Sequence, residues 1–127
     1  MKHLILASHG DLSQAIKKSA EMIMGPQENI TAISLEPQES QEDFKSKFEE
    51  AKSGLEDFVV FTDLSGGTPN NVVARYLLEG DDFPVYAGMN LPMVIAFVNA
   101  EMLEEGDVDY SEKAKENILK INDMLGK

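Results

Sequence analysis

Short apolar segments alternate along this chain with segments whose apolar residues recur every three or four positions. Two of the short segments are nearly continuous apolar runs, which is typical of buried parallel strands. The intervening segments have the spacing of amphipathic helices. Such alternation requires right-handed crossovers and a parallel sheet that is covered on both faces. The expected strands are residues 4–7, 30–35, 58–62 and 84–87.

Helix boundaries are marked by residues with well-understood end effects. Gly25-Pro26 is expected to end the first helix, and Ser40 followed by Asp43 resembles a capping box that opens the second. Asn90-Leu91-Pro92 leads into an apolar helix over residues 92–103. A turn at residues 106–110 and a final amphipathic helix over residues 114–125 complete the prediction.

The predicted fold is therefore α/β, with a doubly wound, mainly parallel sheet and helices on both faces. The expected strand order is 2-1-3-4, and one further antiparallel strand fits at the edge. With 127 residues, 43% of them hydrophobic, the chain is expected to form one domain over residues 1–127.

The chain is strongly acidic, with a formal charge of −12 and a pI of about 4.4. This charge repels phosphate backbones, so nucleic acid is not expected as a partner. The surplus carboxylates either steer a partner with a basic face or simply keep the protein soluble. The absence of cysteine excludes disulfides and thiolate chemistry. No segment resembles a signal peptide or a membrane helix, so we expect a cytoplasmic protein.

Two polar loops follow the first and third expected strands, at residues 8–11 and 62–70. In a doubly wound sheet, ligands bind beyond the carboxyl ends of the strands, where the strand order reverses. If these two strands are neighbours, His9 and Asp63 emerge at the same edge of the sheet. We therefore expect the two side chains to lie within reach of each other.

His9 has the chemistry of a nucleophile, because imidazole titrates near neutral pH and offers an uncharged ring nitrogen. A carboxylate that accepts the hydrogen of one ring nitrogen fixes the tautomer and turns the other lone pair outward. It also stabilises the positive charge that develops when a bond to phosphorus forms. Asp63 is the candidate for this role, and a turn or capping aspartate is the alternative.

The segment Gly66-Gly67-Thr68-Pro69 adds a place for a phosphoryl group. Glycines let the backbone approach a ligand closely, Thr68 is able to cap a helix and offers a hydroxyl, and proline suits a first helical turn. Free amides and the positive end of a helix dipole would then face the crevice. We expect Ser8, Ser65 and Asn90 at the rim of this site.

Other chemistries have little support. His3 opens the first strand at the far edge of the sheet, and no spacing typical of metal ligands is present, so neither a metal nor a cofactor is expected. No nucleophile-elbow motif supports a hydrolytic triad. Six methionines are expected to pack in the core or on helix faces, namely Met22, Met24, Met89, Met93, Met102 and Met124.

Four motifs in the same order resemble the IIA domain of the mannose family of the bacterial sugar phosphotransferase system. The resemblance covers about residues 2–103 and is looser beyond. The motifs are Ser8-His9-Gly10, Glu21-Met22-Ile23-Met24-Gly25, residues 62–71 from Thr62-Asp63 through Gly66-Gly67-Thr68 to Asn71, and Ala87-Gly88-Met89-Asn90-Leu91-Pro92-Met93.

The resemblance implies that His9 accepts a phosphoryl group from the histidine phosphocarrier HPr. A IIB component would receive it and phosphorylate sugar entering through a membrane permease. The resemblance also implies a hydrogen bond between His9 and Asp63 and a phosphoryl contact from Thr68, where relatives usually carry serine. Relatives often have tryptophan at or beside the position of Ser65. They are homodimers that exchange a C-terminal strand, so we expect a homodimer.

Several rivals share parts of this pattern. A receiver domain needs an acidic pair after the first strand, where this chain has Ser8-His9. Phosphohistidine mutases and phosphatases need an arginine before the histidine, which is missing here. The phosphocarrier subunit of dihydroxyacetone kinase and a non-enzymatic regulatory dimer of the same fold stay open as alternatives.

Overall fold

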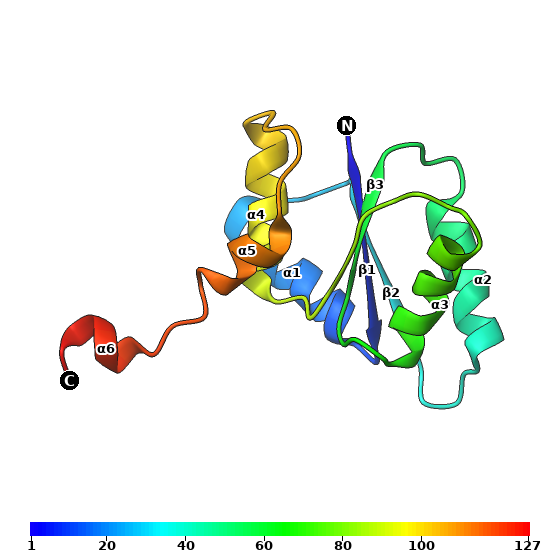
Figure 1. Ribbon diagram of the computed structural model, residues 1–127, viewed down its shortest axis with the longest axis horizontal. Coiled ribbons are helices and arrows are strands. Elements are labelled where there is room, and N and C mark those ends of the chain that lie inside the picture. Colours follow the sequence, from blue (N-terminus) through cyan, green and yellow to red (C-terminus); the bar gives the residue numbers. More distant parts are fainter.

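A computed structural model describes all residues from 1 to 127 and contains one parallel sheet in the order β2-β1-β3-β4 (Figure 1). The predicted fold class and strand order are confirmed. The strands are β1 His3–His9, β2 Ile30–Leu35, β3 Phe58–Thr62 and β4 Val85–Ala87. The helices are α1 Leu12–Met24, α2 Gln41–Lys52, α3 Thr68–Leu78, α4 Leu91–Met102, α5 Tyr110–Lys115 and α6 Ile121–Leu125.

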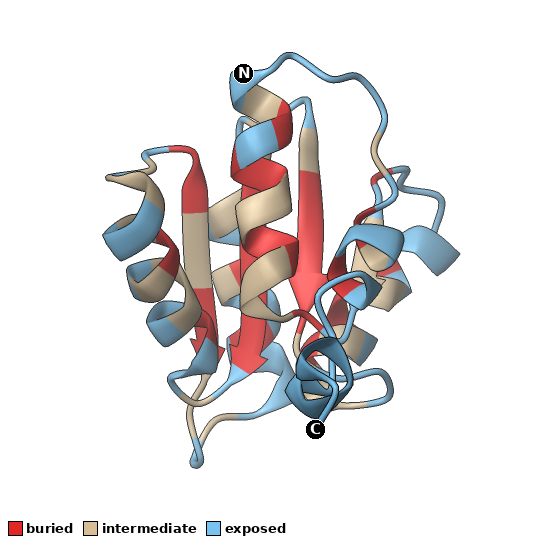
Figure 2. Cartoon of the chain, turned by 90° about the vertical axis from the view of Figure 1, so that its left-hand side faces the viewer, coloured by how far each residue is buried: buried red, intermediate tan, exposed pale blue.

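Helices cover both faces of the sheet, with α1, α4 and α5 on one side and α2 and α3 on the other (Figure 1). Alternate residues of β1 serve the two cores, as the period of two in a strand requires. Leu4 and Leu6 pack in the core beneath α1 and α4, where Phe97 also lies. Ile5 and Ala7 pack in the core beneath α2 and α3. The central strand is thus fixed from both sides, and Figure 2 shows the buried residues running along the strands.

The predicted helix boundaries are confirmed at three places. Gly25, with φ of 85°, ends α1. Ser40 caps α2 in a complete capping box, in which the Ser40 side chain accepts from the Asp43 N–H and the Asp43 carboxylate accepts from the Ser40 N–H. The Asn90 side chain accepts from the Met93 N–H at the start of α4. The contacts of Ser40 and Asn90 start α2 and α4 beyond the carboxyl ends of β2 and β4.

The C-terminal region departs from the sequence prediction. In place of one amphipathic helix over residues 114–125, the structure has two short helices, α5 and α6, joined by an extended segment. The sheet has no antiparallel edge strand within the chain. The segment with α6 projects away from the rest of the molecule (Figure 1), so its apolar residues have no core within this chain to pack against.

The prediction for the methionines is correct only in part. Met89 and Met93 are buried in the core beneath α4, whereas Met22, Met102 and Met124 are exposed. Apolar spacing alone does not tell a core face from an outer face when a helix is apolar on more than one side. None of the helices is both long enough and apolar enough to cross a membrane.

Candidate functional site

His9 and Asp63 meet at the carboxyl edge of the sheet, as predicted. β1 and β3 are parallel neighbours whose last paired residues are Ala7 and Thr62, and the Asp63 N–H donates to the Ala7 carbonyl at 3.1 Å. The next positions along both strands therefore lie side by side. His9 is the last residue of β1, and Asp63 directly follows β3.

One carboxylate oxygen of Asp63 holds His9 twice. Oδ2 accepts from the backbone N–H of His9 at 2.9 Å and lies 2.8 Å from the ring Nδ1. A carboxylate only accepts, so Nδ1 donates a ring hydrogen to it, which leaves Nε2 as the nitrogen that bears the lone pair whenever the ring carries one hydrogen. Because both contacts end on one oxygen, they fix the position of the ring relative to its own backbone.

The two partners differ sharply in exposure. The His9 side chain is 48% exposed, whereas that of Asp63 is 9% exposed. The second oxygen of Asp63, Oδ1, is buried and has no hydrogen-bond partner. A buried carboxylate oxygen without a protein partner costs free energy. The arrangement presents an accessible ring nitrogen while its orienting carboxylate is shielded from solvent.

Gly67 forms the floor beneath the His9 ring. A Cβ atom at Gly67 would lie 2.7 Å from His9 Cε1 and 3.4 Å from Nε2, so any larger residue would push the ring. Gly67 has an ordinary φ of −85° and is the N-cap of α3. The requirement for glycine is therefore steric contact with the ring and not an unusual backbone conformation.

The helix α3 begins directly beyond this contact. Thr68 is its first residue, and no side chain caps the helix, so the predicted capping role of Thr68 is wrong. The reason is that the chain enters the helix one residue earlier, at Gly67. Pro69 occupies the first turn, as expected from its missing N–H. Gly66 and Gly67 thus lead into the amino end of α3 beside the His9 ring, and Thr68 is the first residue of that helix.

The three residues expected at the rim lie in different environments. Ser65 is exposed in the loop after β3. Ser8 is fully buried, because its side chain points away from the site and its Oγ accepts from the Ser13 N–H at 2.8 Å. Asn90 is half-buried and caps α4. The placement of Ser8 at the rim is therefore a wrong prediction.

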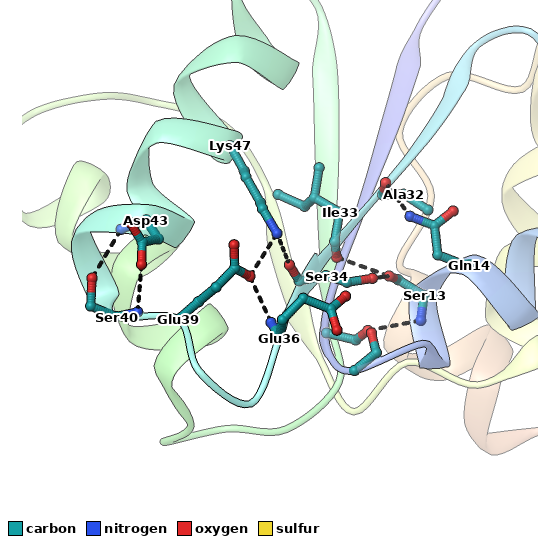
Figure 3. Close-up of polar contacts among 12 residues, drawn as sticks. Ser13, Gln14, Ala32, Ile33, Ser34, Glu36, Glu39, Ser40, Asp43 and Lys47 are labelled. Carbon is teal, nitrogen blue, oxygen red and sulfur yellow. Dashed lines mark hydrogen bonds and ion pairs between the residues drawn. The ribbon is translucent and has the colours of Figure 1, made fainter.

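Polar contacts join β2 to α1 on one side and to α2 on the other (Figure 3). The buried Ser13 hydroxyl donates to the Ile33 carbonyl at 2.8 Å, and Ser13 Oγ lies 3.4 Å from Ser34 Oγ. Further out, Lys47 Nζ donates to the Ser34 carbonyl and to Glu39, both at 2.7 Å. The hydrogen bond from Lys47 also lowers the pKa of Glu39. These contacts fix the end of β2, the strand that pairs with β1 next to His9.

Asn71 is a site residue that the sequence reasoning did not single out. Its side-chain Nδ2 donates a hydrogen bond to the Gly66 carbonyl at 3.1 Å. The available signal was an asparagine in the first turn of a helix that follows a Gly-Gly turn, since asparagine side chains readily bond to nearby backbone.

His3 lies at the opposite end of β1 from His9. No cluster of three or more His, Asp or Glu side chains is placed to hold a metal ion.

The comparisons with known proteins agree on one family. The family model described as the PTS system fructose IIA component matches residues 3–123. Because this match covers nearly the whole sequence, the chain belongs to the mannose family of IIA components of the bacterial phosphotransferase system (PTS). Membership of this family implies a phosphocarrier role in sugar phosphotransfer.

Individual relatives support the same assignment. The PTS system fructose-specific EIIA component of Bacillus subtilis is 33% identical over 98 residues, which cover 75% of this chain and 67% of that protein. The PTS system mannose-specific EIIAB component of Escherichia coli K12 is 30% identical over 112 residues, which cover 86% of this chain and 34% of that protein. The chain therefore spans about a third of the length of this two-part relative.

A solved structure gives the same fold. The crystal structure of phosphotransferase system component EIIA from Streptococcus agalactiae superposes with a TM-score of 0.84 and 28% sequence identity. The match covers 96% of this chain and 98% of that one. The arrangement of sheet and helices described above is therefore that of a known EIIA structure.

We predict that Gly67→Ala disturbs the His9 ring, because the new Cβ cannot remain 2.7 Å from Cε1. The ring should leave its contact with Asp63, and overpacking should lower the free energy of unfolding by about 1–3 kcal/mol. Nitrogen NMR shifts of the imidazole report the change, as the native pattern with a hydrogen on Nδ1 gives way to a mixture of tautomers. Gly106→Ala is the matched control, since a Cβ there meets nothing within 4 Å. An unchanged His9 spectrum in Gly67→Ala would show that this contact does not seat the ring.

Proposed function

We propose that this protein is a phosphohistidine carrier that accepts a phosphoryl group on His9 from HPr and passes it to a IIB component. The IIB component would then phosphorylate sugar entering through its membrane permease, with the carrier itself in the cytoplasm. The observation that carries the proposal is the 2.8 Å contact between His9 Nδ1 and a shielded Asp63, beside a half-exposed ring.

The transfer step follows from this geometry. The Nε2 lone pair of His9 attacks the phosphorus of the phosphohistidine donor, the Nε2–P bond forms, and the donor N–P bond breaks with its electron pair returning to the donor ring. The hydrogen on Nδ1 stays in its bond to Asp63 throughout. The positive charge that develops on the His9 ring is then stabilised by the adjacent carboxylate. In the second transfer a nucleophilic side chain of IIB attacks the phosphorus, and the Nε2–P bond breaks with its electron pair returning to His9.

The phosphoryl oxygens would face Gly66, Gly67 and Thr68. Helix α3 has eleven residues, and its first amides have no partner within the helix, so the amino end carries a partial positive charge. The side-chain hydroxyl of Thr68 adds a further donor. Since transfer between two imidazoles is close to thermoneutral, positioning and these dipoles are the main catalytic effects.

The surroundings of the site suit a carrier that meets two partners in turn. The ring is 48% exposed at the edge of the sheet, so a donor and then an acceptor are able to approach the same nitrogen. The formal charge of −12 favours an encounter with a basic protein face. This long-range attraction weakens as ionic strength rises.

We predict that incubation with phosphoenolpyruvate, enzyme I and HPr places one phosphate on the protein, labile in acid and stable in base. His9→Ala should abolish the label, because it removes the accepting nitrogen. His3→Ala is the matched control and should keep the label, since His3 lies at the other end of β1. Intact-protein mass spectrometry measures the added phosphate. A label that persists in His9→Ala would reject the assignment.

In the same assay, Asp63→Asn should preserve the fold and slow transfer about tenfold to a hundredfold, as the loss of a charged hydrogen-bond partner implies. Unchanged kinetics would leave Asp63 with a structural role only. A non-enzymatic regulatory dimer, the alternative from the sequence, would take up no label in the native protein.

We further propose that the protein is a homodimer. The C-terminal segment projects from the rest of its chain and has five exposed apolar residues, Ile118, Leu119, Ile121, Met124 and Leu125. β4 pairs only with β3, so its other edge has unpaired backbone groups. A second copy able to cover these features would stabilise both chains.

We predict that light scattering after size exclusion gives twice the 14.0 kDa chain mass for the full protein. A variant that ends at residue 116 should run as a monomer, because it lacks the five apolar residues. The double variant Ile121→Lys, Leu125→Lys tests the same point in the full-length chain. A full-length protein that elutes as a monomer at micromolar concentration contradicts the proposal.

A further inference from the structure

Asn71 holds both carbonyls of the Gly66-Gly67 turn. Its side-chain Nδ2 donates to the Gly66 carbonyl at 3.1 Å, and its backbone N–H donates to the Gly67 carbonyl at 2.8 Å. Asn71 lies in the first turn of α3 and is itself exposed. One residue thus ties the turn below His9 to a helix that is anchored in the core through Val72 and Val73.

These two bonds also set the direction of two amides. The peptide bonds of the chain are all trans, and in a trans peptide the carbonyl and the N–H point in opposite directions. With the Gly66 and Gly67 carbonyls held towards Asn71, the N–H groups of Gly67 and Thr68 point away from it. Neither amide donates a hydrogen bond within the chain. Both are therefore available to a ligand.

The position of Gly67 brings these amides close to the reactive nitrogen. Its Cα packs so closely on the His9 ring that a Cβ there would lie 3.4 Å from Nε2. An anion bonded to Nε2 would therefore sit beside the turn. Rotation of the turn would carry the amides away, because glycine residues impose little conformational restriction of their own.

We propose that Asn71 is a positioning residue whose side chain, through the Gly66 carbonyl, aims the Gly67 amide at the phosphoryl group on His9, beside a Thr68 amide that the helix backbone orients. This inference rests on the proposed phosphocarrier function and deepens it. Asn71 touches neither the ring nor the phosphoryl group, and it acts through the backbone of the turn.

The neighbouring asparagine has a different task. Asn70 Oδ1 accepts from the Thr62 hydroxyl at 2.8 Å, which ties α3 to the end of β3. Asn70 is half-buried and contacts the strand, whereas Asn71 is exposed and contacts the turn. Docking α3 on the sheet requires a contact with the strand, such as the one that Asn70 makes. The side chain of Asn71 instead bonds to the one turn that lies against His9.

The test compares Asn71→Leu, which keeps the size of the side chain but removes the donor, with Asn71→Gln, which retains an amide donor. Asn99→Ala on α4 is the control, because Asn99 is exposed and its side chain makes no hydrogen bond. Two quantities are measured. One is the equilibrium constant for sharing the phosphoryl group between HPr and His9, and the other is the shift of the Gly67 and Thr68 amide resonances on phosphorylation.

In the native protein, phosphorylation should move both amide resonances downfield. Asn71→Leu should reduce the Gly67 shift and leave the Thr68 shift closer to native, because the backbone bond to the Gly67 carbonyl remains. It should also lower the equilibrium constant about threefold to tenfold, the effect of one poorly made hydrogen bond. Asn71→Gln should recover part of both effects, and Asn99→Ala should match the native protein. A merely structural role would lower the melting temperature of Asn71→Leu without changing the two amide shifts.

The outcomes separate the two proposals. If the native protein takes no phosphate on His9, the proposed function fails whatever Asn71 does. If the native protein is phosphorylated on His9 while a folded Asn71→Leu retains the native amide shifts and equilibrium constant, the proposed role of Asn71 is overturned.

Discussion

The two bonds that His9 donates to a single oxygen of Asp63 are the interaction on which the rest of the site depends. They exist because β1 and β3 are parallel neighbours in a register that pairs Ala7 with Thr62. Both strands are buried from both sides, so neither shifts without breaking two cores. The site geometry thus rests on the packing of the sheet, and the loops only complete it.

Much of this arrangement could be predicted from the sequence because its cause is local or periodic. Apolar runs and helical spacing predict the strands and helices, and the usual topology of a doubly wound sheet then makes the first and third strands neighbours. The polar ends of these two strands locate His9 and Asp63 at one edge. The pair Gly66-Gly67 also predicts a place where the backbone approaches a ligand closely. That residues 1–127 form a single domain stays a prediction, as do the functional roles of the site residues.

Other features depend on tertiary contacts that no periodicity encodes. The sequence predicts Ser8 at the rim, yet the alternation of strand side chains turns it inward, where it bonds to α1. Thr68 does not cap α3, because the N-cap position falls one residue earlier, at Gly67. The apolar positions after residue 116 resemble a helix face, but their burial requires a surface that one chain does not provide. Asn71 belongs to a sequence motif, but its hydrogen bond to the Gly66 carbonyl depends on how the turn folds back on α3.

The buried serine contacts behind His9 have a consequence for how such a protein diverges. Ser8, Ser13 and Ser34 fix the strand ends from within, out of reach of any docking protein. Exposed loop positions such as Ser65 are then able to change in size and polarity without displacing the imidazole. The surface beside the ring is therefore separate from the buried contacts that hold the end of its strand, and a substitution in the loop changes the first without disturbing the second.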